Sequence, residues 1–363
     1  MMVGVLPPPI HGQSIATQAL FEADFSPIKK VLIPIRSSKT LNSVGKFSFS
    51  KVSGLIALVA KAWVAWFRHR PSILYYTAGS GAWIPFTRDV VFLSLCRPLF
   101  KRTLIHYHSG NLQEFVEKTR LRSLLGRLAY GRGAWTLRLG PHCPAPDYPE
   151  NRVFELPNGL DAPPISNSKG SSEEFRILFL GNLFREKGVL DLIDAVGKMA
   201  LSYPTKIRLS LVGSWPSDDA KREIEDKITT LPPNVHCPDP RPAFGQEKWQ
   251  MLGEHDVLVF PSYYSSENLP LVIIEAMAAS LPVVATYWRG IRSLVEDGQT
   301  GFLTPISDPN AIADALLKLA DSPGLSIELG RNARRKYEGF FTLDHFLFNI
   351  KTLLREASGS SDR

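Results

Sequence analysis

Residues 256–286 read DVLVFPSYYSSENLPLVIIEAMAASLPVVAT. Two short apolar runs, 256–262 and 282–286, are separated by a polar loop and a longer apolar stretch. Short apolar runs bounded by Pro and Ser are typical of buried strands, and the stretch between them is long enough for a helix. A strand, a helix and a second strand in this order predict a parallel βαβ unit.

The same alternation extends along the whole chain. Further strands are expected at 2–6, 29–35, 72–77 and 102–108, and then at 175–182, 207–213 and 234–237. Helices are expected at 50–68 and 110–130, and then at 187–201, 217–230, 244–253, 269–279 and 308–321. Strands that alternate with helices predict an α/β fold with parallel sheets.

A segment rich in Pro, Asn, Gly and Ser, residues 155–175, indicates a linker between two series of strands and helices. We therefore expect two doubly wound, Rossmann-like domains, 1–160 and 161–335, that face each other across a cleft. Within the helical segment 328–356, residues 336–356 would pack back on the first domain, and 357–363 would be a disordered tail. Ligands of such sheets bind at the carboxyl ends of the strands.

Charge is distributed unevenly along the 363 residues. Residues 1–160 hold 20 Lys and Arg against 8 Asp and Glu, a net +12, whereas residues 161–363 hold 22 against 27, a net −5. A basic half indicates an anionic partner such as a membrane surface, a phosphate or a nucleic acid, and the alternative is a solvated basic surface.

Several classes of protein are disfavoured by the sequence. The three cysteines have no paired spacing, which argues against a disulfide framework or a zinc knuckle and fits a reducing compartment. The start of the chain lacks the features of a signal peptide, and the longest apolar run, 52–67, contains Lys61 and is short for a membrane span. Neither GxGxxG nor GxxxxGK[ST] occurs.

Glu267 and Glu275 flank the predicted start of the helix at 269–279. Pro270 suits the first turn of a helix, and the backbone amides around Asn268, Leu269 and Leu271 would form an anion site suited to a diphosphate. Carboxylates repel phosphate but accept hydrogen bonds from hydroxyl groups. Two carboxylates around an anion site therefore suit a nucleotide sugar, which has hydroxyl groups on both sides of its diphosphate.

A second cluster of polar residues follows the strand at 175–182, in FLGNLFREKGVLDLIDA at 179–195. Arg185 and Lys187 would project from the loop between this strand and the next helix. Both side chains can neutralise a phosphate, Arg as a fork and Lys as a point charge. The alternative is an ordinary solvated loop.

These stretches together resemble the retaining glycosyltransferases of family 4, which have the two-domain GT-B fold. The segment ENLPLVIIE at 267–275 is similar to their E-x7-E signature, and GNLFREKG at 181–188 to their phosphate-binding loop. The resemblance also covers PPPIHGQS at 7–14, YHSG at 107–110 and VEDGQTGFLTP at 295–305. It spans nearly the whole chain and is more specific in the second half, with the bacterial surface-polysaccharide enzymes as the nearest type.

The resemblance implies a donor-binding set at matching positions. Glu275 would hold the ribose hydroxyls, and Arg185 and Lys187 the diphosphate. Gly12 would let the first loop approach the diphosphate closely. The full donor-binding set is Gly12, Arg185, Lys187, Gly213, Asn268, Leu269, Pro270, Leu271 and Glu275.

The resemblance also implies catalytic residues, and these are His108, Glu267, Arg185 and Lys187. Glu267 would contact the transferred sugar near its reacting carbon, where it either takes part in the chemistry or only orients the ring. His108 would touch the sugar or the reacting centre, and His11 would lie on the acceptor side. Asn182 departs from the family, which often has Arg at this position.

A metal site is not expected from the pair His106 and His108. The two residues would share one face of the strand at 102–108, but no third ligand is near in sequence. The family that the chain resembles works without a metal, because basic side chains take its place. We expect a structural role for His106, no cofactor, and a UDP- or GDP-sugar as substrate.

The acceptor is expected on the basic first domain. The segment 55–71 places Trp63, Trp66 and Phe67 beside Arg68, His69 and Arg70, a combination that suits a helix at an anionic membrane surface. The alternative is a helix packed on the sheet. The acceptor would be a lipid-linked saccharide or glycolipid, and the protein a cytoplasmic one associated peripherally with the inner face of the cell membrane.

The sequence therefore predicts a retaining, metal-independent hexosyltransferase. Two other functions stay open at this stage: a nucleotide-sugar epimerase of the same fold, and a non-catalytic protein that binds nucleotides or nucleic acid. The basic half fits nucleic acid, but no known binding motif for it occurs, so we expect no nucleic-acid partner. The sugar, the base, the linkage and the oligomeric state are left open by the sequence.

Overall fold

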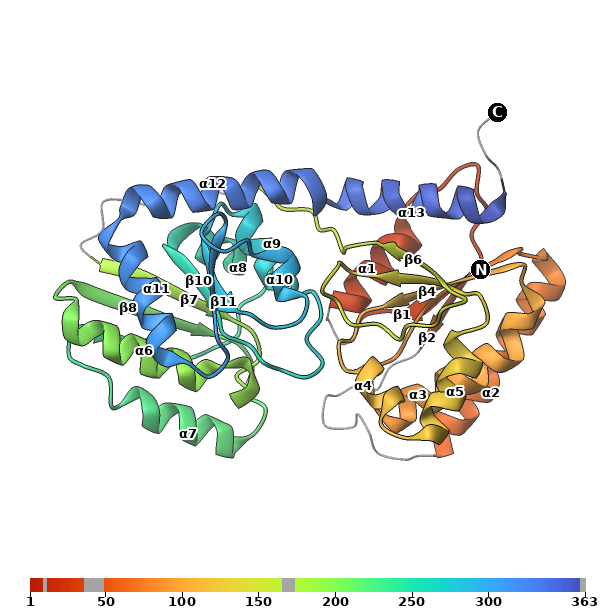
Figure 1. Cartoon of the computed structure of the whole chain (residues 1–363), viewed down its shortest axis with the longest axis horizontal. Helices are drawn as coiled ribbons and strands as arrows, with labels where there is room; N and C mark the ends of the chain where they lie inside the picture. Colours follow the sequence, from red (N-terminus) through yellow and green to blue (C-terminus); the bar gives the residue numbers. More distant parts are fainter. Residues whose placement is uncertain (9–11, 36–48, 165–173, 360–363) are drawn as a thin grey trace. The chain divides into compact units, whose positions relative to one another are not determined.

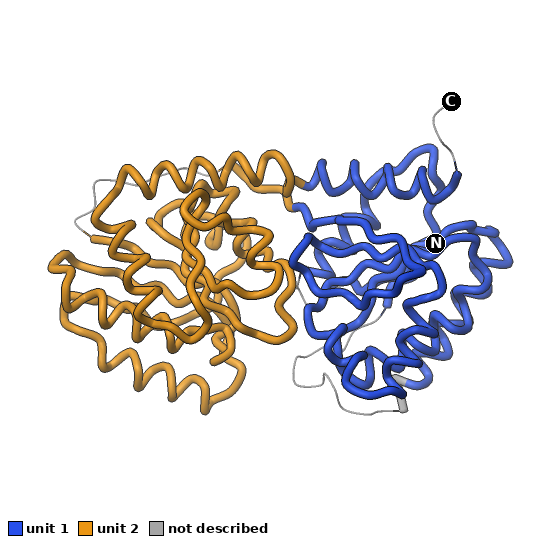
Figure 2. The backbone as a smooth tube through the Cα atoms, in the orientation of Figure 1, with its two compact units in different colours: residues 1–159, 343–363 blue, residues 160–342 orange. Residues whose placement is uncertain are grey.

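The computed structural model describes residues 1–8, 12–35, 49–164 and 174–359. The chain forms two compact units, shown in Figure 2. Unit 1 comprises Met1–Gly159 and Leu343–Arg363, and unit 2 comprises Leu160–Thr342. Each unit contains its own six-stranded sheet in which neighbouring strands are parallel, so the expected α/β fold is confirmed.

The sheet of unit 1 has the strand order β2-β1-β3-β4-β5-β6. Its strands are β1 (Met2–Val5), β2 (Leu32–Ile35), β3 (Ile73–Thr77), β4 (Arg102–Tyr107), β5 (Trp135–Arg138) and β6 (Arg152–Glu155). Its helices are α1 (Gly12–Glu22), α2 (Phe49–His69), α3 (Trp83–Cys96), α4 (Leu112–Glu117), α5 (Arg120–Tyr130) and α13 (Leu343–Ser358), with a short 3-10 turn, η2 (Arg97–Leu99).

Helices cover both faces of this sheet (Figure 1). Alternate residues of the strands point to opposite faces, so Tyr76 joins the core beneath α2, α3 and α5, whereas Tyr75 joins the core beneath α1 and α13. On the second face α13 contributes buried side chains such as Phe346 and Ile350. The last helix of the chain is thus part of the hydrophobic core of unit 1.

The sheet of unit 2 has the strand order β12-β11-β10-β7-β8-β9. Its strands are β7 (Glu174–Leu180), β8 (Lys206–Val212), β9 (Val235–His236), β10 (Val257–Phe260), β11 (Val283–Thr286) and β12 (Gly301–Thr304). Its helices are η3 (Arg185–Lys187), α6 (Val189–Ser202), α7 (Asp218–Ile228), α8 (Gly245–Glu254), α9 (Leu271–Ala278), α10 (Ile291–Leu294), α11 (Pro309–Asp321) and α12 (Pro323–Phe340).

The topology of unit 2 brings four loops to one edge of its sheet. Strands β11, β10, β7 and β8 are consecutive neighbours and parallel, so the segments that follow Thr286, Phe260, Leu180 and Val212 leave from the same carboxyl edge. All four strands have buried side chains at these ends. This edge carries the segments in which the sequence predicted the donor site.

Three strands were not predicted from the sequence: β5, β6 and β12, each of four residues. Strand β6 is largely exposed at the edge of its sheet, and the expected linker at 155–175 begins on its last residue. Strands this short that lie at or near a sheet edge lack the apolar run by which a buried strand is recognised. The other strands occur in the expected order, and the expected helix at 110–130 is two helices, α4 and α5. Helices α1, α3 and α10 were also not predicted.

The expected helix at 328–356 is two helices. Helix α12 belongs to unit 2 and α13 to unit 1, and the predicted boundary between residues 335 and 336 falls inside α12. At the break, Phe341 accepts a hydrogen bond from the amide of Leu160 at 3.1 Å, and Leu160 pairs with Thr342. Phe341 is the C-cap of α12, with φ −122° and ψ 14°, so the helical conformation ends where the pairing with Leu160 begins.

Among the residues that the structure describes, no helix combines the length and the apolar character that crossing a bilayer requires.

Candidate functional site

The loop from Pro261 to Pro270 leads from β10 into α9. The buried strand ends at Phe260, and the helix starts at Leu271. Pro270 is the N-cap, with φ −68° and ψ 119°, so it precedes the first turn in which the sequence placed it. The proline ring fixes a φ that suits a helix, but the extended ψ keeps the residue outside it. Asn268 and Leu269 are both buried at this entry.

Glu267 and Lys187 form an ion pair at the carboxyl edge of the sheet. The Nζ of Lys187 donates to Oε2 of Glu267, and the two side chains are only 14% and 10% exposed. Oε2 also accepts a hydrogen bond from the buried hydroxyl of Ser262 at 3.0 Å. The structure thus brings together two of the predicted catalytic residues, although they lie far apart in sequence, and adds Ser262, which the sequence analysis missed.

Ser262 is itself held by a neighbouring strand. Its carbonyl oxygen accepts a hydrogen bond from the hydroxyl of Thr286, the last residue of β11, and both side chains are fully buried. The Glu267 carboxylate is therefore oriented by β10 and β11 together. A serine or threonine at the end of a buried strand is a weak sequence signal, because such residues also occur there for purely structural reasons.

Lys187 lies over two aromatic rings. Its Nζ is 5.1 Å from the ring centroid of Phe260 and 5.3 Å from that of Tyr264. Cations over aromatic faces are stabilised electrostatically, and more so when they are desolvated. Tyr264 also stacks on Phe184 at 6.0 Å. The ammonium group therefore has a fixed position defined by two rings and one carboxylate.

Gly188 lets the loop that carries Lys187 approach β10 closely. Its φ is +75°, and a Cβ atom there would lie 2.2 Å from the carbonyl oxygen of Pro261. Only glycine combines this backbone conformation with so close a contact. The glycine thus places η3 directly beside the segment that contains Glu267.

Gly213 has a similar packing role at the end of β8. A Cβ atom at this position would be 1.7 Å from the carbonyl oxygen of Gly181, at the end of β7. The sequence predicted Gly213 in the donor-binding set. The structure gives it a local reason, the close approach of two neighbouring loops at the carboxyl edge.

Arg185 does not join the pair formed by Lys187 and Glu267. Its guanidinium is 65% exposed and forms an ion pair with Glu223 on α7. The hydrogen bond and the charge of Glu223 raise the pKa of Arg185. The side chain is thus available at the surface, on the side of η3 that faces α7.

Glu275 has a partner that the sequence analysis missed. Its Oε1 accepts a hydrogen bond from Lys248 of α8 at 2.6 Å, and the Glu275 side chain is 9% exposed. Burial raises the pKa of Glu275, and the charge and hydrogen bond of Lys248 oppose that rise. A buried carboxylate requires such a partner, but nothing in the sequence pattern identified Lys248, on the preceding helix, as that partner.

His106 and His108 lie at the end of β4 in unit 1. His106 is fully buried, with Nε2 3.1 Å from the carbonyl oxygen of Leu156 and Nδ1 2.7 Å from the hydroxyl of Tyr75. Because a carbonyl only accepts, Nε2 carries the proton and Nδ1 accepts from Tyr75. Burial lowers the pKa of His106 to about 4. The contacts of His106 are structural ones, in keeping with the sequence-based interpretation.

The structure places the other predicted residues of unit 1 within that unit. His108 directly follows β4 and is partly exposed, with its ring centroid 4.1 Å from that of His106. Gly12 is the first residue of α1. His11 lies outside the described residues. Among the described residues, three or more His, Cys, Asp or Glu side chains do not gather in a way that could hold a metal ion.

Comparison with known proteins finds a family match within unit 2. Residues 174–322 match the family model described as glycosyl transferases group 1. The capsular polysaccharide biosynthesis glycosyltransferase CapM of Staphylococcus aureus is 28% identical over 196 residues, which are 52% of this chain and 49% of CapM. The chain spans about half the length or less of the first curated relatives that it matches.

Solved structures show the same fold. Sucrose-phosphate synthase from Thermosynechococcus elongatus superposes with a TM-score of 0.70 over 99% of this chain and 100% of that chain, at 19% identity. HepE of Anabaena, in complex with UDP-glucose, superposes with a TM-score of 0.61 over 82% of both chains, at 20% identity. The match to the family model places residues 174–322 of unit 2 among the group 1 glycosyltransferases, and the superpositions show that the chain shares the fold of these solved structures.

Proposed function

We propose that the chain is a retaining, metal-independent glycosyltransferase that moves a sugar from a UDP- or GDP-sugar to a hydroxyl group of a lipid-linked saccharide or glycolipid. The observation that supports this most directly is the buried pair of Lys187 and Glu267 at the carboxyl edge of the sheet in unit 2. This edge is where ligands of parallel α/β sheets bind. HepE, which shares the fold, has been solved with UDP-glucose.

The donor would bind at this edge by its diphosphate. The ammonium group of Lys187, the start of α9 and the exposed guanidinium of Arg185 supply positive charge for the departing nucleoside diphosphate. Because these groups already neutralise the leaving group, the proposed reaction needs no metal. Glu275, whose Oε1 is held by Lys248, would accept hydrogen bonds from the ribose through Oε2.

Glu267 would contact the transferred sugar. Its carboxylate is fixed by Lys187 and Ser262, so it can accept hydrogen bonds from sugar hydroxyls without reorganising. In the proposed reaction the acceptor hydroxyl attacks from the face that the diphosphate leaves, with a donor phosphate oxygen as the base. His108 of unit 1 would contact the sugar.

The acceptor is proposed to be bound at a membrane surface by unit 1. Helices α2, α3 and α5 cover one face of its sheet, and we call them the basic helix layer. Nine large apolar side chains of this layer are at least 40% exposed: Val52, Ile56, Trp63, Val64, Phe67, Trp83, Leu95, Leu121 and Leu124. Seventeen large apolar side chains of the described residues reach this exposure, so more than half of them belong to this layer.

The charge of the basic helix layer also suits an anionic lipid surface. The sequences of α2, α3 and α5 contain Asp89 as their single acidic residue, and its side chain is completely buried. Exposed aliphatic and aromatic side chains surrounded by basic ones are the composition of interfacial helices. Trp66 contributes less than expected from the sequence, because it is half-buried beneath the guanidinium of Arg70. We place the protein at the cytoplasmic face of the cell membrane.

Thermal unfolding with added nucleotides tests the donor proposal. UDP or GDP should raise the unfolding midpoint of the parent, because a ligand that binds only the folded state stabilises it. The Lys187→Ala variant should lose this shift, and EDTA should leave it unchanged. If neither nucleotide shifts the parent, or if Lys187→Ala retains the full shift and full transfer, the proposed diphosphate site is wrong.

The stereochemistry is tested with the donor that gives the largest shift. Nuclear magnetic resonance of the product should show the anomeric configuration of the donor preserved, and inversion would contradict the retaining mechanism. Incubation with donor and no acceptor should give no epimerised nucleotide sugar. An epimerised product in that incubation would instead assign the site to an epimerase.

A further inference from the structure

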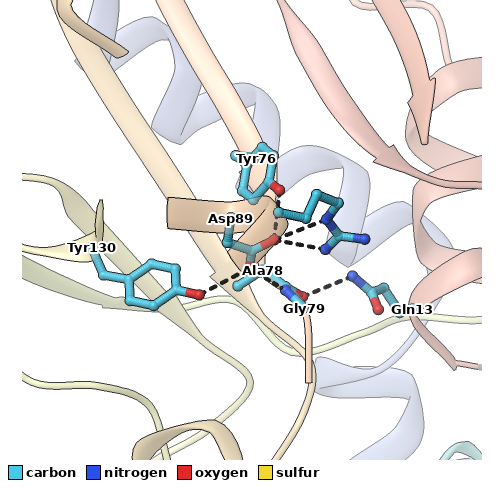
Figure 3. A network of polar contacts seen from close by, with 7 residues as sticks. Gln13, Tyr76, Ala78, Gly79, Asp89 and Tyr130 are labelled. Carbon is cyan, nitrogen blue, oxygen red and sulfur yellow. Dashed lines mark hydrogen bonds and ion pairs between the residues drawn. The ribbon is translucent and has the colours of Figure 1, made fainter. Parts of the chain in front are cut away.

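The loop that follows β3 in unit 1 is built around one buried carboxylate. Asp89 of α3 is completely buried and accepts hydrogen bonds from three neutral donors (Figure 3). The Tyr76 hydroxyl donates to Oδ1 at 2.7 Å. The Gly79 amide and the Tyr130 hydroxyl donate to Oδ2 at 2.6 and 2.9 Å. Each oxygen of the carboxylate therefore has a partner before any cation is considered.

Arg88 is an additional partner of the same carboxylate. Its Nε and Nη2 donate to Oδ1 of Asp89 at 3.0 and 2.7 Å. The arginine also supplies the opposite charge that a fully buried carboxylate requires. In turn, the buried and rigidly held carboxylate of Asp89 fixes the position and orientation of the Arg88 guanidinium.

The loop is also shaped to leave room for this guanidinium. A Cβ atom at Gly79 would lie 2.8 Å from Nη2 of Arg88 and 3.3 Å from Oδ2 of Asp89. The adjacent Ala78 is tied to the first turn of α1, because its carbonyl oxygen accepts a hydrogen bond from Gln13 at 3.1 Å. The guanidinium is thus held at the point where the carboxyl end of β3 meets the start of α1.

Part of this guanidinium remains accessible. Of its five N–H donors, the bonds to Asp89 use one on Nε and one on Nη2, and the Tyr76 hydroxyl is a further partner of the guanidinium. The side chain is 20% exposed. Asp89 is the only Asp or Glu within residues 72–96, and its side chain is completely buried.

We propose that Arg88 is an anion subsite of unit 1 that binds a phosphoryl group of the acceptor. The proposal rests on the proposed function, in which the acceptor is a lipid-linked saccharide. A guanidinium that is already oriented by a carboxylate binds phosphate at a low cost in side-chain entropy. Asp89 acts through Arg88 and is a positioning residue.

A binding measurement tests the subsite separately from the donor site. Isothermal titration is carried out with octyl diphosphate, below its micelle concentration, on protein saturated with the nucleoside diphosphate that it binds. The nucleotide occupies the phosphate site of unit 2, so the heat reports a second site. Arg88→Gln should weaken octyl diphosphate binding at least about tenfold, the loss expected for charged hydrogen bonds. The nucleotide-induced shift in unfolding midpoint should stay that of the parent.

Arg127→Gln is the matched control, because Arg127 lies on α5 with a side chain that is 65% exposed. It should bind octyl diphosphate as the parent does. Arg88→Lys keeps the charge but not the fork, and should also weaken binding. This second variant decides the outcome if Arg88→Gln does not fold.

Two further probes separate the sources of phosphate. Inorganic pyrophosphate should bind the saturated parent and lose affinity in Arg88→Gln, whereas binding to phosphatidylglycerol vesicles should fall no further in Arg88→Gln than in Arg127→Gln, because each variant removes one charge from the basic helix layer. Equal binding of octyl diphosphate by the parent and both Arg88 variants would overturn the proposal and leave the arginine as a structural partner of Asp89. A parent with no nucleotide shift would instead contradict the proposed function.

Discussion

Lys187 and Glu267 form an ion pair with each other, so each limits what the other can bind. The ammonium group that would receive a diphosphate is bonded to a carboxylate, and that carboxylate also accepts from Ser262. A bound diphosphate would therefore share Lys187 with Glu267 across a short distance, where like charges repel. At the scale of single residues, the site is arranged to favour a ligand whose sugar offers hydroxyl groups to Glu267.

Removing that charge should separate binding from transfer. In Glu267→Gln the ammonium group of Lys187 faces no competing carboxylate, so UDP or GDP should bind at least about tenfold more tightly. Transfer should be lost, because the sugar contact is altered. Isothermal titration and a transfer assay check this, with Glu254→Gln as a control on α8, where Glu254 accepts a bond from Gln250. If Glu267→Gln binds the nucleotide as the parent does or more weakly, Glu267 does not compete with the diphosphate for Lys187.

At the scale of elements, the carboxyl edge of unit 2 depends on loops that pack closely. Gly188 touches the backbone of Pro261, and Gly213 touches that of Gly181. These contacts determine where η3 and the loop after β8 leave the sheet. The position of Lys187 relative to Glu267 thus depends on the backbone as much as on the two side chains.

Two glycine substitutions separate backbone conformation from close packing. Gly298 has φ +69° and open space around a new Cβ atom, so Gly298→Ala should cost only the left-handed conformation, about 1 kcal/mol of unfolding free energy. Gly188→Ala has a similar φ and adds the contact with Pro261, and it should cost at least about 2 kcal/mol more. Urea unfolding measures both. If the two variants lose the same unfolding free energy, the loop at Gly188 shifts to accommodate the new Cβ atom and close packing does not hold it in place.

Strand β4 links elements of unit 1 through His106, whose ring contacts Tyr75 of β3 and Leu156 just after β6. Burial lowers its pKa from 6.5 to about 4, so below 6.5 the unfolded chain binds more protons than the folded one. The stability of unit 1 should therefore fall as the pH drops from 6.5 to 4, by about 3 kcal/mol from this residue.

The contribution of His106 is measured by comparing the parent with His106→Gln, which can still form hydrogen bonds but does not titrate. Urea unfolding of both proteins at pH 7 and pH 4.5 gives the pH-dependent part. The parent should lose more stability than the variant over this range. An identical loss in the two proteins would assign the acid sensitivity to other groups.

On the scale of the whole molecule, charge and exposed apolar surface are concentrated in the same part of the chain. The first 160 residues carry the net +12, and the basic helix layer within them exposes nine large apolar side chains. The residues proposed to bind the diphosphate, Arg185 and Lys187, lie in the other unit, within the mildly acidic remainder. This division suits a protein that holds a nucleotide sugar with one unit and a lipid-borne acceptor with the other.

Vesicle sedimentation tests the membrane surface. The parent should sediment with phosphatidylglycerol vesicles, less with phosphatidylcholine, and less at high salt. The variant Ile56→Ser with Phe67→Ser removes two exposed side chains and should weaken binding at least about tenfold. The control is Leu201→Ser with Phe244→Ser, because these side chains of unit 2 are even more exposed than Ile56 and Phe67. Binding that ignores lipid charge and salt would contradict an electrostatic docking surface.

Much of the fold and part of the site could be predicted locally. Strands and helices follow from short apolar runs, and the loops after β7 and β10 are continuous in sequence, so Lys187 and Glu267 could be placed at strand ends. Short strands at or near a sheet edge, such as β6 and β12, could not, because they lack a buried apolar run. The change of unit between α12 and α13 was misplaced because helical periodicity continues across it.

The sequence by itself therefore determined the α/β class, the order of the elements and which loops carry polar residues. Only the tertiary structure decided the pairs: Lys187 with Glu267, Lys248 with Glu275, and Arg88 with a carboxylate that also binds Tyr130. The physical reason is that such contacts depend on strand order. β10 lies beside β7 in the sheet although 76 residues separate the end of β7 from the start of β10 (181–256), and no local periodicity encodes that neighbour.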